Sequence, residues 1–353
     1  LYQKMTKEKK NKPSKELPLG FVDRQEKELL VRDFIISNIK EVMIKYGFQY
    51  LETPSFEYSD SIGKFLPDKD RPDEGVFSFK DENKWLSLRY DLTAPLARYV
   101  AKNYLEIPKP FKRYQLGTVW RNEKPGPGRF REFLQFDADF VGTKSLQADA
   151  ELCVMISEIL EKCGLTKSDY IIKISSRKIT EELFKKINIS DNQQKLTVLR
   201  ALDKIDRLGW SGVKELLGEG RKDKSGDFTK GANLKLEDIK TIEETLKKNS
   251  PETEDLVEIF KIFKGYNFNN FEFDPSVIRG LEYYTGAIFE VNLKFDVTNN
   301  KGQVIQFGSI GGGGRYDNLV NNFGNYDAPA TGISIGLDRL VYALMQKKEF
   351  KVK

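Results

Sequence analysis

Arginine, carboxylate and tyrosine side chains are the groups with which this 353-residue sequence could do chemistry, because it contains no histidine. Ser–His–Asp triads, Cys–His dyads and histidine-ligated zinc are therefore excluded within this chain. Its two cysteines, Cys153 and Cys163, match no metal-binding spacing, so we predict no metal site built from protein ligands. Any metal ion used in catalysis would have to arrive on a substrate.

The segment Phe130–Val141 is expected to be a strand with two unlike faces, since side chains alternate along a strand. The apolar face carries Leu134, Phe136, Ala138 and Phe140, and the other face carries Phe133, Gln135, Asp137 and Asp139. On its own, this pattern is typical of a sheet with one solvated face. Charged side chains also surround the preceding turn, namely Arg121, Glu123, Arg129 and Arg131. Opposite charges this close together suit a substrate with both ammonium and phosphate groups.

Two further arginines have positions that favour anion binding. Arg279 precedes Tyr283 and Tyr284 on an extended stretch, where the alternative is an exposed arginine beside tyrosines packed in a sheet. Arg339 falls in the first turn of a predicted helix, where the helix dipole and free N–H groups favour anions. As an isolated signal, that position more often holds a solvated arginine.

The segment Phe307–Tyr316 contains four consecutive glycines. It lacks the spacing of a P-loop and the strand–GxGxxG–helix context of a dinucleotide fold. We therefore predict that the glycines let the backbone approach a bound ligand closely.

Apolar periodicity and turn residues predict the elements that position these groups. Helices are expected at 25–46, 145–163 and 336–345, a strand followed by a helix within 85–105, and mostly helices over 177–268. Strands are expected at 49–53, 113–121, 130–141, 170–174, 287–295, 304–310 and 331–335. Hairpin-joined strands with helices grouped apart favour an α+β fold with an antiparallel sheet flanked by helices.

We predict four regions along the chain. Residues 1–18 form a disordered basic arm, 19–176 and 269–353 the two parts of one catalytic domain, and 177–268 a helical insertion domain. The net charge of +5 fits a polyanionic partner but also a solvated lysine-rich surface. Neither a membrane span nor a signal peptide is predicted, and two cysteines indicate reduced thiols in the cytoplasm.

The sequence resembles the class II aminoacyl-tRNA synthetases from about Leu19 to Leu344. Three segments resemble the motifs of that class: the helix 25–46 with Glu52-Thr53-Pro54 for motif 1, 120–133 for motif 2, and 336–339 for motif 3. Within the class, RGLEYYTG at 279–286 and GGGRYDNLV at 312–320 resemble the two signatures of the histidyl-tRNA synthetase family. LRYDLT at 88–93 and QFDAD at 135–139 fit the branch that uses Asp where other members use Glu.

The resemblance implies a reaction, its partners and its site residues. The reaction joins L-histidine to ATP, with Mg²⁺ on the phosphates, and then to tRNA(His), in a homodimer formed through motif 1. For ATP, the implied residues are Arg121 and Arg339 on the phosphates, Phe133 stacked on adenine, Glu123 accepting from its amino group, and Arg129 as a further ATP-binding residue. For histidine, they are Asp91, Thr93 and Gln135 on the ammonium group, and Asp139 and Tyr284, with Tyr283, at the imidazole. Arg279, bridging the histidine carboxylate and the α-phosphate, would be catalytic together with Arg121 and Arg339.

Two interpretations stay open within this resemblance. Family members normally continue past motif 3 into an anticodon-binding domain, which the 353 residues do not include. The chain is then expected to be the catalytic part of a synthetase, or the shorter paralogue that acts as regulatory subunit of ATP phosphoribosyltransferase. A loop within the insertion, with Arg221, Lys222, Lys224 and Lys230, is equally a tRNA contact or a solvated loop.

Overall fold

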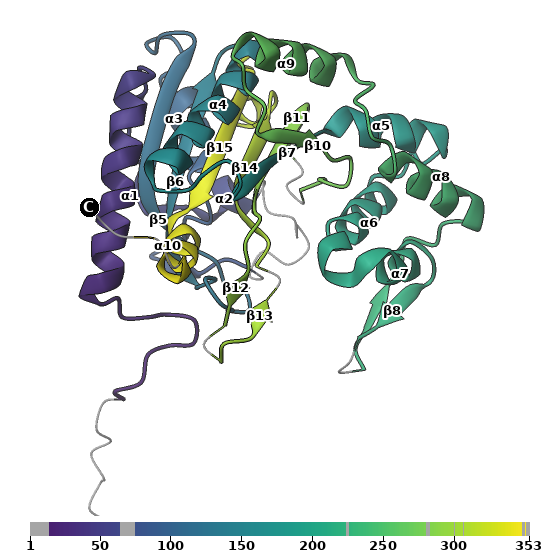
Figure 1. Ribbon diagram of the computed structural model, residues 1–353, viewed down its shortest axis with the longest axis horizontal. Coiled ribbons are helices and arrows are strands. Elements are labelled where there is room, and N and C mark those ends of the chain that lie inside the picture. The colour runs from purple at the N-terminus through teal and green to yellow at the C-terminus, as the bar shows by residue number, and fades with distance from the viewer. Residues whose placement is uncertain are drawn as a thin grey trace, which may run out of the picture.

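A central mixed sheet organises the computed structural model, which describes residues 14–63, 75–223, 226–279, 283–299, 301–305, 307–347 and 350. Within these residues the sheet has eight strands in the order β1-β5-β6-β15-β14-β11-β7-β10 (Figure 1). The strands are β1 (Gln49–Tyr50), β5 (Phe111–Trp120), β6 (Glu132–Val141), β15 (Ala330–Gly336), β14 (Ser309–Arg315), β11 (Ala287–Leu293), β7 (Tyr170–Ser176) and β10 (Phe271–Phe273).

The inner strands of this sheet pair antiparallel, as the sequence predicts, and the α+β class is confirmed. The two outer pairs, β1 with β5 and β7 with β10, are parallel. A parallel neighbour needs a long crossover, and both outer pairs are separated by connections that contain several helices and strands. Antiparallel pairing therefore holds for the strands that border the charged residues.

Two predicted strands differ from the structure. The predicted strand 49–53 is reduced to β1, which has two residues. The predicted strand 304–310 divides into β13 (Val304–Ile305), which pairs with β12 (Val297–Thr298), and the start of β14. The glycine run is consequently part of a sheet strand. Residues 1–13 of the predicted arm lie outside the described residues.

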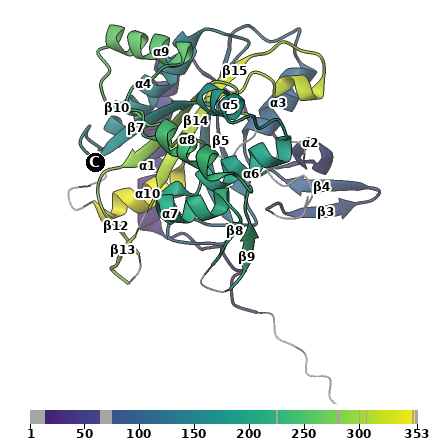
Figure 2. The same ribbon diagram turned by 90° about the vertical axis from the view of Figure 1, so that its right-hand side faces the viewer.

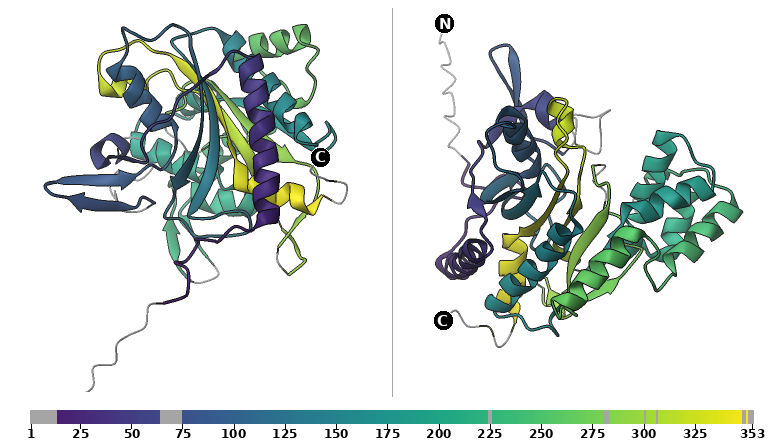
Figure 3. Two further views of the ribbon diagram at one scale, coloured as in Figure 1. Left: turned by 90° about the vertical axis from the view of Figure 1, so that its left-hand side faces the viewer. Right: turned by 90° about the horizontal axis from the view of Figure 1, so that it is seen from above.

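Four helices cover one face of the sheet: α1 (Glu26–Lys45), α4 (Leu146–Lys162), α9 (Glu254–Gly265) and α10 (Leu337–Gln346). They share the largest hydrophobic core with the apolar face of β6 (Figure 3). Along α1 the buried residues recur at helical spacing and are Val31, Ile35, Ile39, Val42 and Met43. The opposite face of the sheet is thereby left for polar side chains.

A smaller sheet of β2 (Phe56–Tyr58), β4 (Lys84–Leu88) and β3 (Ser78–Asp81) projects from the body (Figure 2). Helix α2 (Ser59–Gly63) packs against this sheet and against α3 (Thr93–Lys102), and α3 packs in turn against the short helix η1 (Val320–Phe323). Buried Arg89, just after β4, donates to the backbone oxygens of Thr53 and Thr118 at 2.7 Å each. No helix in the described ranges is long and apolar enough to cross a membrane.

The helical segment after β7 has its own hydrophobic core. It contains α5 (Arg177–Lys186), α6 (Asn192–Leu202), α7 (Ile205–Leu217), the hairpin β8 (Gly220–Lys222) and β9 (Phe228–Lys230), and α8 (Leu236–Leu246). We call these elements the insertion module, which stands apart from the sheet in Figures 1 and 3. The following helix α9 packs in the main core, whereas Ile278 packs in the core of the module. The division between the two cores therefore does not coincide with the predicted boundary at 268, because α9 lies before that residue and Ile278 lies after it.

A buried ion pair joins α4 to the end of β14. The side chains of Asp149 and Arg315 are 0% and 7% exposed and bonded to each other. Arg315 also donates to the backbone oxygens of Thr143 at 3.0 Å and Ser145 at 3.1 Å. Removing one partner of such a pair leaves an uncompensated buried charge.

Asp149→Ala should therefore lower the free energy of unfolding by about 3–5 kcal/mol. The exposed pair Lys144–Asp327, whose side chains are 76% and 77% exposed, provides the matched control. Lys144→Ala should cost less than about 1 kcal/mol, because solvent already screens that pair. Urea unfolding of both variants measures the difference, and equal losses would contradict the importance of the buried pair.

Candidate active site

Strand register places a row of functional side chains on the sheet face opposite the helices. Gln115, Asp137, Ser334, Gly312 and Glu290 are aligned across β5, β6, β15, β14 and β11. Residues directly opposite each other on paired strands share a face. This face forms the floor of a cavity of ≈ 740 Å³. The predicted polar face of β6 is thus inside the protein, and Asp137 and Asp139 are each 2% exposed.

Most of the residues predicted for the site line this cavity. They are Asp91, Thr93, Arg121, Arg129, Gln135, Asp139, Arg279, Tyr283, Tyr284 and Arg339. Glu123 and Phe133 are outside the lining. Glu123 is exposed and its Oε1 accepts from the hydroxyl of Tyr90 at 2.5 Å. Arg121 lies between two rings, 4.5 Å from the centroid of Tyr90 and 5.2 Å from that of Phe133.

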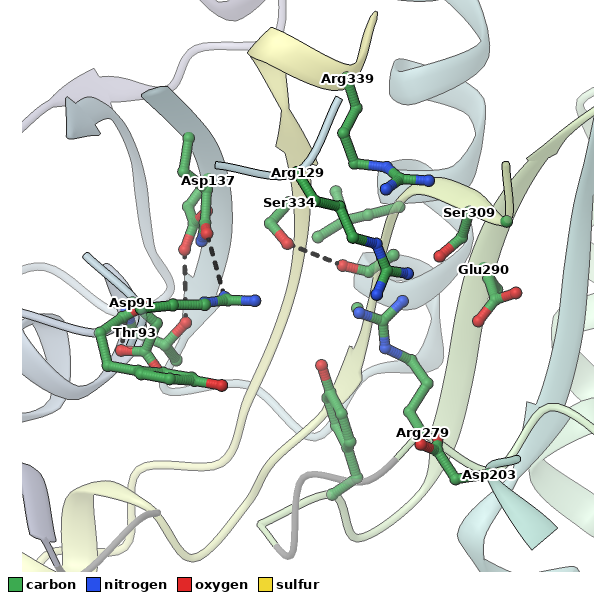
Figure 4. A pocket seen from close by; sticks show the side chains of 18 of the residues that line it. Asp91, Thr93, Arg129, Asp137, Asp203, Arg279, Glu290, Ser309, Ser334 and Arg339 are labelled. Carbon is green, nitrogen blue, oxygen red and sulfur yellow. Dashed lines mark hydrogen bonds between the residues drawn. The ribbon is translucent and has the colours of Figure 1, made fainter. Parts of the chain in front are cut away.

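One end of the cavity is acidic (Figure 4). Asp137 accepts from the hydroxyl of Thr93 at 3.3 Å and from the amide of Gln135 at 2.7 Å. Asp91 accepts from the backbone N–H groups of Thr93 at 3.1 Å and Ala94 at 2.9 Å, at the start of α3. Burial, with a contribution from Asp139, raises the pKa of Asp137 to about 7. Burial raises the pKa of Asp91 as well.

Asp139 is held in place from both sides. Its Oδ1 accepts from the hydroxyl of Tyr316 at 2.5 Å, and its Oδ2 is 3.2 Å from Nη2 of Arg113. Arg113 is fully buried and lowers the pKa of Asp91, Asp137 and Asp139 against the effect of burial. Arg121 also lowers the pKa of Asp91, yet burial keeps the pKa values of all three carboxyl groups above their ordinary value. This end can therefore bind a cationic group strongly.

The other end of the cavity is cationic. Figure 4 shows the side chains of Arg129, Arg279 and Arg339 pointing into it, beside Glu290 and Ser309. Arg339 donates to the backbone oxygen of Phe307, yet its buried Nε has no hydrogen-bond partner. Burial and the nearby charge of Arg129 lower the pKa of Arg339 to about 10. A bound anion would relieve this repulsion and supply the missing acceptor.

Arg279 reaches the cavity over the glycine run. Its Nη1 donates to the backbone oxygen of Gly311 at 3.4 Å, and a Cβ atom on Gly312 would collide with its guanidinium group. A Cβ atom on Gly311 would be 2.5 Å from the backbone oxygen of Ser334. The atoms nearest to these two positions belong to the protein, and Gly312 makes room for Arg279 while it also lines the cavity. The close approach of a ligand to the glycine run stays a prediction.

Burial alone would lower the pKa of Arg279, but Tyr284 and Glu290 keep it above its ordinary value. The arginine is therefore a permanent cation inside the cavity. The residues that follow Arg279 in the RGLEYYTG segment, 280–282, lie outside the described residues.

Several lining residues were not predicted. Asp137 could have been assigned, since it alternates with Gln135 and Asp139 on one strand. Tyr316 was part of a quoted signature, but nothing in the sequence indicated its bond to Asp139. The insertion module contributes Asp203, Lys204, Asp206 and Arg207 from the junction of α6 and α7. Only the fold brings those residues to the site.

Comparisons with known proteins agree on one family. The family model described as histidyl-tRNA synthetase matches residues 20–340. The histidine–tRNA ligase of Bartonella quintana (strain Toulouse) is 51% identical over 373 residues, which cover 98% of this chain and 74% of that protein. That of Rhizobium meliloti (strain 1021) is 51% identical over 353 residues, covering 93% and 70% respectively.

A solved structure agrees as well. The crystal structure of histidyl-tRNA synthetase from Nostoc sp. PCC 7120 is similar with a TM-score of 0.75 and 27% identity, covering 96% of this chain and 77% of that one. Since the family model and the two relatives match nearly the whole chain, it belongs to the histidyl-tRNA synthetase family.

Proposed function

We propose that the cavity carries out the first step of histidine–tRNA ligation, in which histidine and ATP form histidyl-adenylate and pyrophosphate. The observation that carries this proposal is the separation of charge within one cavity, with buried carboxylates at one end and arginines at the other. Histidyl-adenylate has an ammonium group and a phosphate in the same relation. Relatives about half identical to the chain are histidine–tRNA ligases, which favours this activity over the regulatory-subunit alternative.

Arg279 is the group that we assign to the reacting atoms. The histidine carboxylate attacks the α-phosphorus of ATP, a bond to oxygen forms there, and the bond to pyrophosphate breaks. Because the carboxylate is already ionised, no general base is needed, and catalysis rests on positioning and on stabilising the added negative charge. Arg279 and Arg121 would bind the α-phosphate, and Arg129 and Arg339 the leaving pyrophosphate.

The acidic end would hold the amino acid. Asp91, Thr93 and Gln135 would bind the ammonium group, with Asp137 as an additional carboxylate next to Thr93 and Gln135. Neutral imidazole has one N–H donor and one acceptor nitrogen. Asp139 would accept from the donor, and the hydroxyl of Tyr284 would donate to the acceptor. Tyr283, whose ring centroid is 4.9 Å from that of Tyr284, would close the pocket over the ring.

Adenine would bind beside Arg121, next to Phe133 and Glu123. Glu123 already accepts from Tyr90, so it is oriented to accept from the adenine amino group as well. Mg²⁺ would arrive on the phosphates of ATP, since it keeps several waters and binds proteins through few carboxylates together with substrate phosphates. Glu290 would contact the ion or its water, and the ion would neutralise phosphate charge.

The larger partners are proposed on surface chemistry. Transfer to tRNA would follow adenylation, with basic Lys222 and Lys230 of the β8–β9 hairpin exposed toward the polyanion. A homodimer would form through α1, which exposes Leu30 and Ile44. Cys153 and Cys163 are free and buried, which fits a reducing cytoplasm.

Arg279→Ala should reduce histidine-dependent ATP–pyrophosphate exchange by about 10² to 10⁴, since a preorganised cation facing a developing oxyanion contributes several kcal/mol. Arg221→Ala, which removes an arginine outside the cavity, should leave the exchange rate within about twofold. Exchange by the unmodified chain is the reference. No exchange by that chain would contradict the ligase activity, and normal exchange by Arg279→Ala would remove this arginine from the mechanism.

Asp137→Asn should stabilise the ligand-free protein in a pH-dependent way. In the unfolded chain this carboxyl ionises near its ordinary pKa of 3.8, whereas in the folded chain its pKa is about 7. Between these values the folded state keeps a proton that the unfolded state releases, so wild-type stability falls as pH rises. The advantage of the variant should grow by on the order of 1 kcal/mol or more from pH 5 to pH 8. Urea unfolding at both pH values measures the difference in free energy of unfolding between the variant and the wild type. The same difference at pH 5 and pH 8 would contradict this prediction.

Ile44→Glu should dissociate the proposed dimer, because it would bury a charge in an apolar interface. Leu236→Glu is the matched control, since Ile44 and Leu236 are both 74% exposed and only Ile44 lies on α1. Sedimentation equilibrium should give a monomer for Ile44→Glu and a dimer for Leu236→Glu. A dimer in both variants would exclude this part of α1 from the interface.

A further inference from the structure

The three residues Val277, Ile278 and Arg279 have three different surroundings. Val277 packs in a small cluster with Tyr284 and Ile288 of the main body. Ile278 packs in the hydrophobic core of the insertion module and is 3% exposed. Arg279 lines the cavity. A single short segment therefore links the core of the insertion module to the arginine that faces the reacting atoms.

We propose that the insertion module positions Arg279 through Ile278, so that the rate of adenylate formation depends on how the module packs. The proposal rests on the role of Arg279 in the proposed function. Ile278 is not among the residues that line the cavity, where a catalytic group would lie. It is a positioning residue that acts through its neighbour in the chain.

The backbone at Arg279 needs such support. Its φ angle is 39°, in the left-handed region that non-glycine residues avoid. A residue in this conformation is strained and persists only where its surroundings hold it there. On the preceding side, the backbone N–H of Val277 donates to the oxygen of Asp274 at 3.1 Å, which fixes the approach to Ile278. Burial of Ile278 then fixes the last residue before the strained one.

The insertion module also contributes side chains to the cavity from the junction of α6 and α7. Asp203, Lys204, Asp206 and Arg207 follow α6 or open α7 and line the cavity. Asp203 contributes to the high pKa of Arg279, and Figure 4 draws both at the same side of the cavity. The module thus borders Arg279 through charged side chains and holds its backbone through Ile278. A shift of the module against the sheet would move the guanidinium group relative to Gly311 and Gly312.

Alanine substitution in two matched isoleucines tests this proposal. Ile278 and Ile239 are both 3% exposed and belong to the same hydrophobic core, but Ile239 lies on α8, away from the Arg279 segment. Both Ile→Ala changes leave a cavity of similar size and should weaken the module comparably. Histidine-dependent ATP–pyrophosphate exchange would be measured at a temperature where circular dichroism shows each variant folded.

Ile278→Ala should lower kcat of exchange by about tenfold or more with little change in the KM for ATP, while Ile239→Ala should stay within about twofold of wild type. Ile278→Val, which keeps most of the side chain, should restore most of the rate and remains informative if the alanine variant does not fold. In an Arg279→Ala background, Ile278→Ala should have almost no further effect, because the residue through which it acts is gone.

Equal rates for Ile278→Ala and Ile239→Ala would overturn the proposal, as would an undiminished effect of Ile278→Ala in the Arg279→Ala background. Slow exchange by Arg279→Ala together with normal exchange by Ile278→Ala would leave the proposed function intact and reject only the positioning role. Normal exchange by Arg279→Ala would instead reject the role of Arg279 itself.

Discussion

Burying the carboxylates of Asp91, Asp137 and Asp139 in one cavity is the constraint on which the rest of the site depends. Taking charges out of water is costly, and the nearby Arg113 and Arg121 do not offset this cost, since the pKa values of all three groups stay raised. The raised pKa of Asp137, about 7, reflects this imbalance. A cationic ligand would complete the charge balance. The acidic end of the cavity therefore destabilises the ligand-free protein, and the same buried carboxylates would bind an ammonium group tightly.

Only a rigid frame can hold such a cluster. The antiparallel pairing of β5, β6 and β15 fixes the spacing of the charged side chains, and the helices behind the sheet bury its other face. Glycine is required on a strand where the side chain of another segment passes directly over the backbone. A Cβ atom on Gly332 would collide with Asp139, as one on Gly312 would with Arg279. The same sheet thus makes room for one group at the acidic end and one at the cationic end.

Sequence reasoning succeeded where a local pattern determines geometry. The alternation in Phe130–Val141 gave the correct face for Gln135 and Asp139, because strand periodicity is local. It did not predict that the glycine run would contact Arg279 and β15, because these partners are distant in sequence. The residues of the α6–α7 junction could not be assigned to the site from the sequence for the same reason. Their proximity to the cavity depends on how the insertion module packs, and packing of distant elements leaves no periodic signal.

The roles of Glu123 and Phe133 rest on motif position, and both residues lie outside the lining of the ligand-free cavity. Glu123 belongs to the connection between β5 and β6, whose course is not determined by strand periodicity, whereas Phe133 lies on β6 itself. The acidic and cationic ends, by contrast, are built on strands and helix starts, and they are the features on which the functional account depends.

Opposite ends of a single cavity are proposed to bind the ammonium group and the phosphate of one ligand. Calorimetric titration with a non-hydrolysable histidyl-adenylate analogue, alongside the same compound without its α-amino group, tests this claim most directly. Loss of a charge-assisted contact to buried carboxylates should weaken binding by about 10² or more. Equal affinities for the two compounds would contradict the claim.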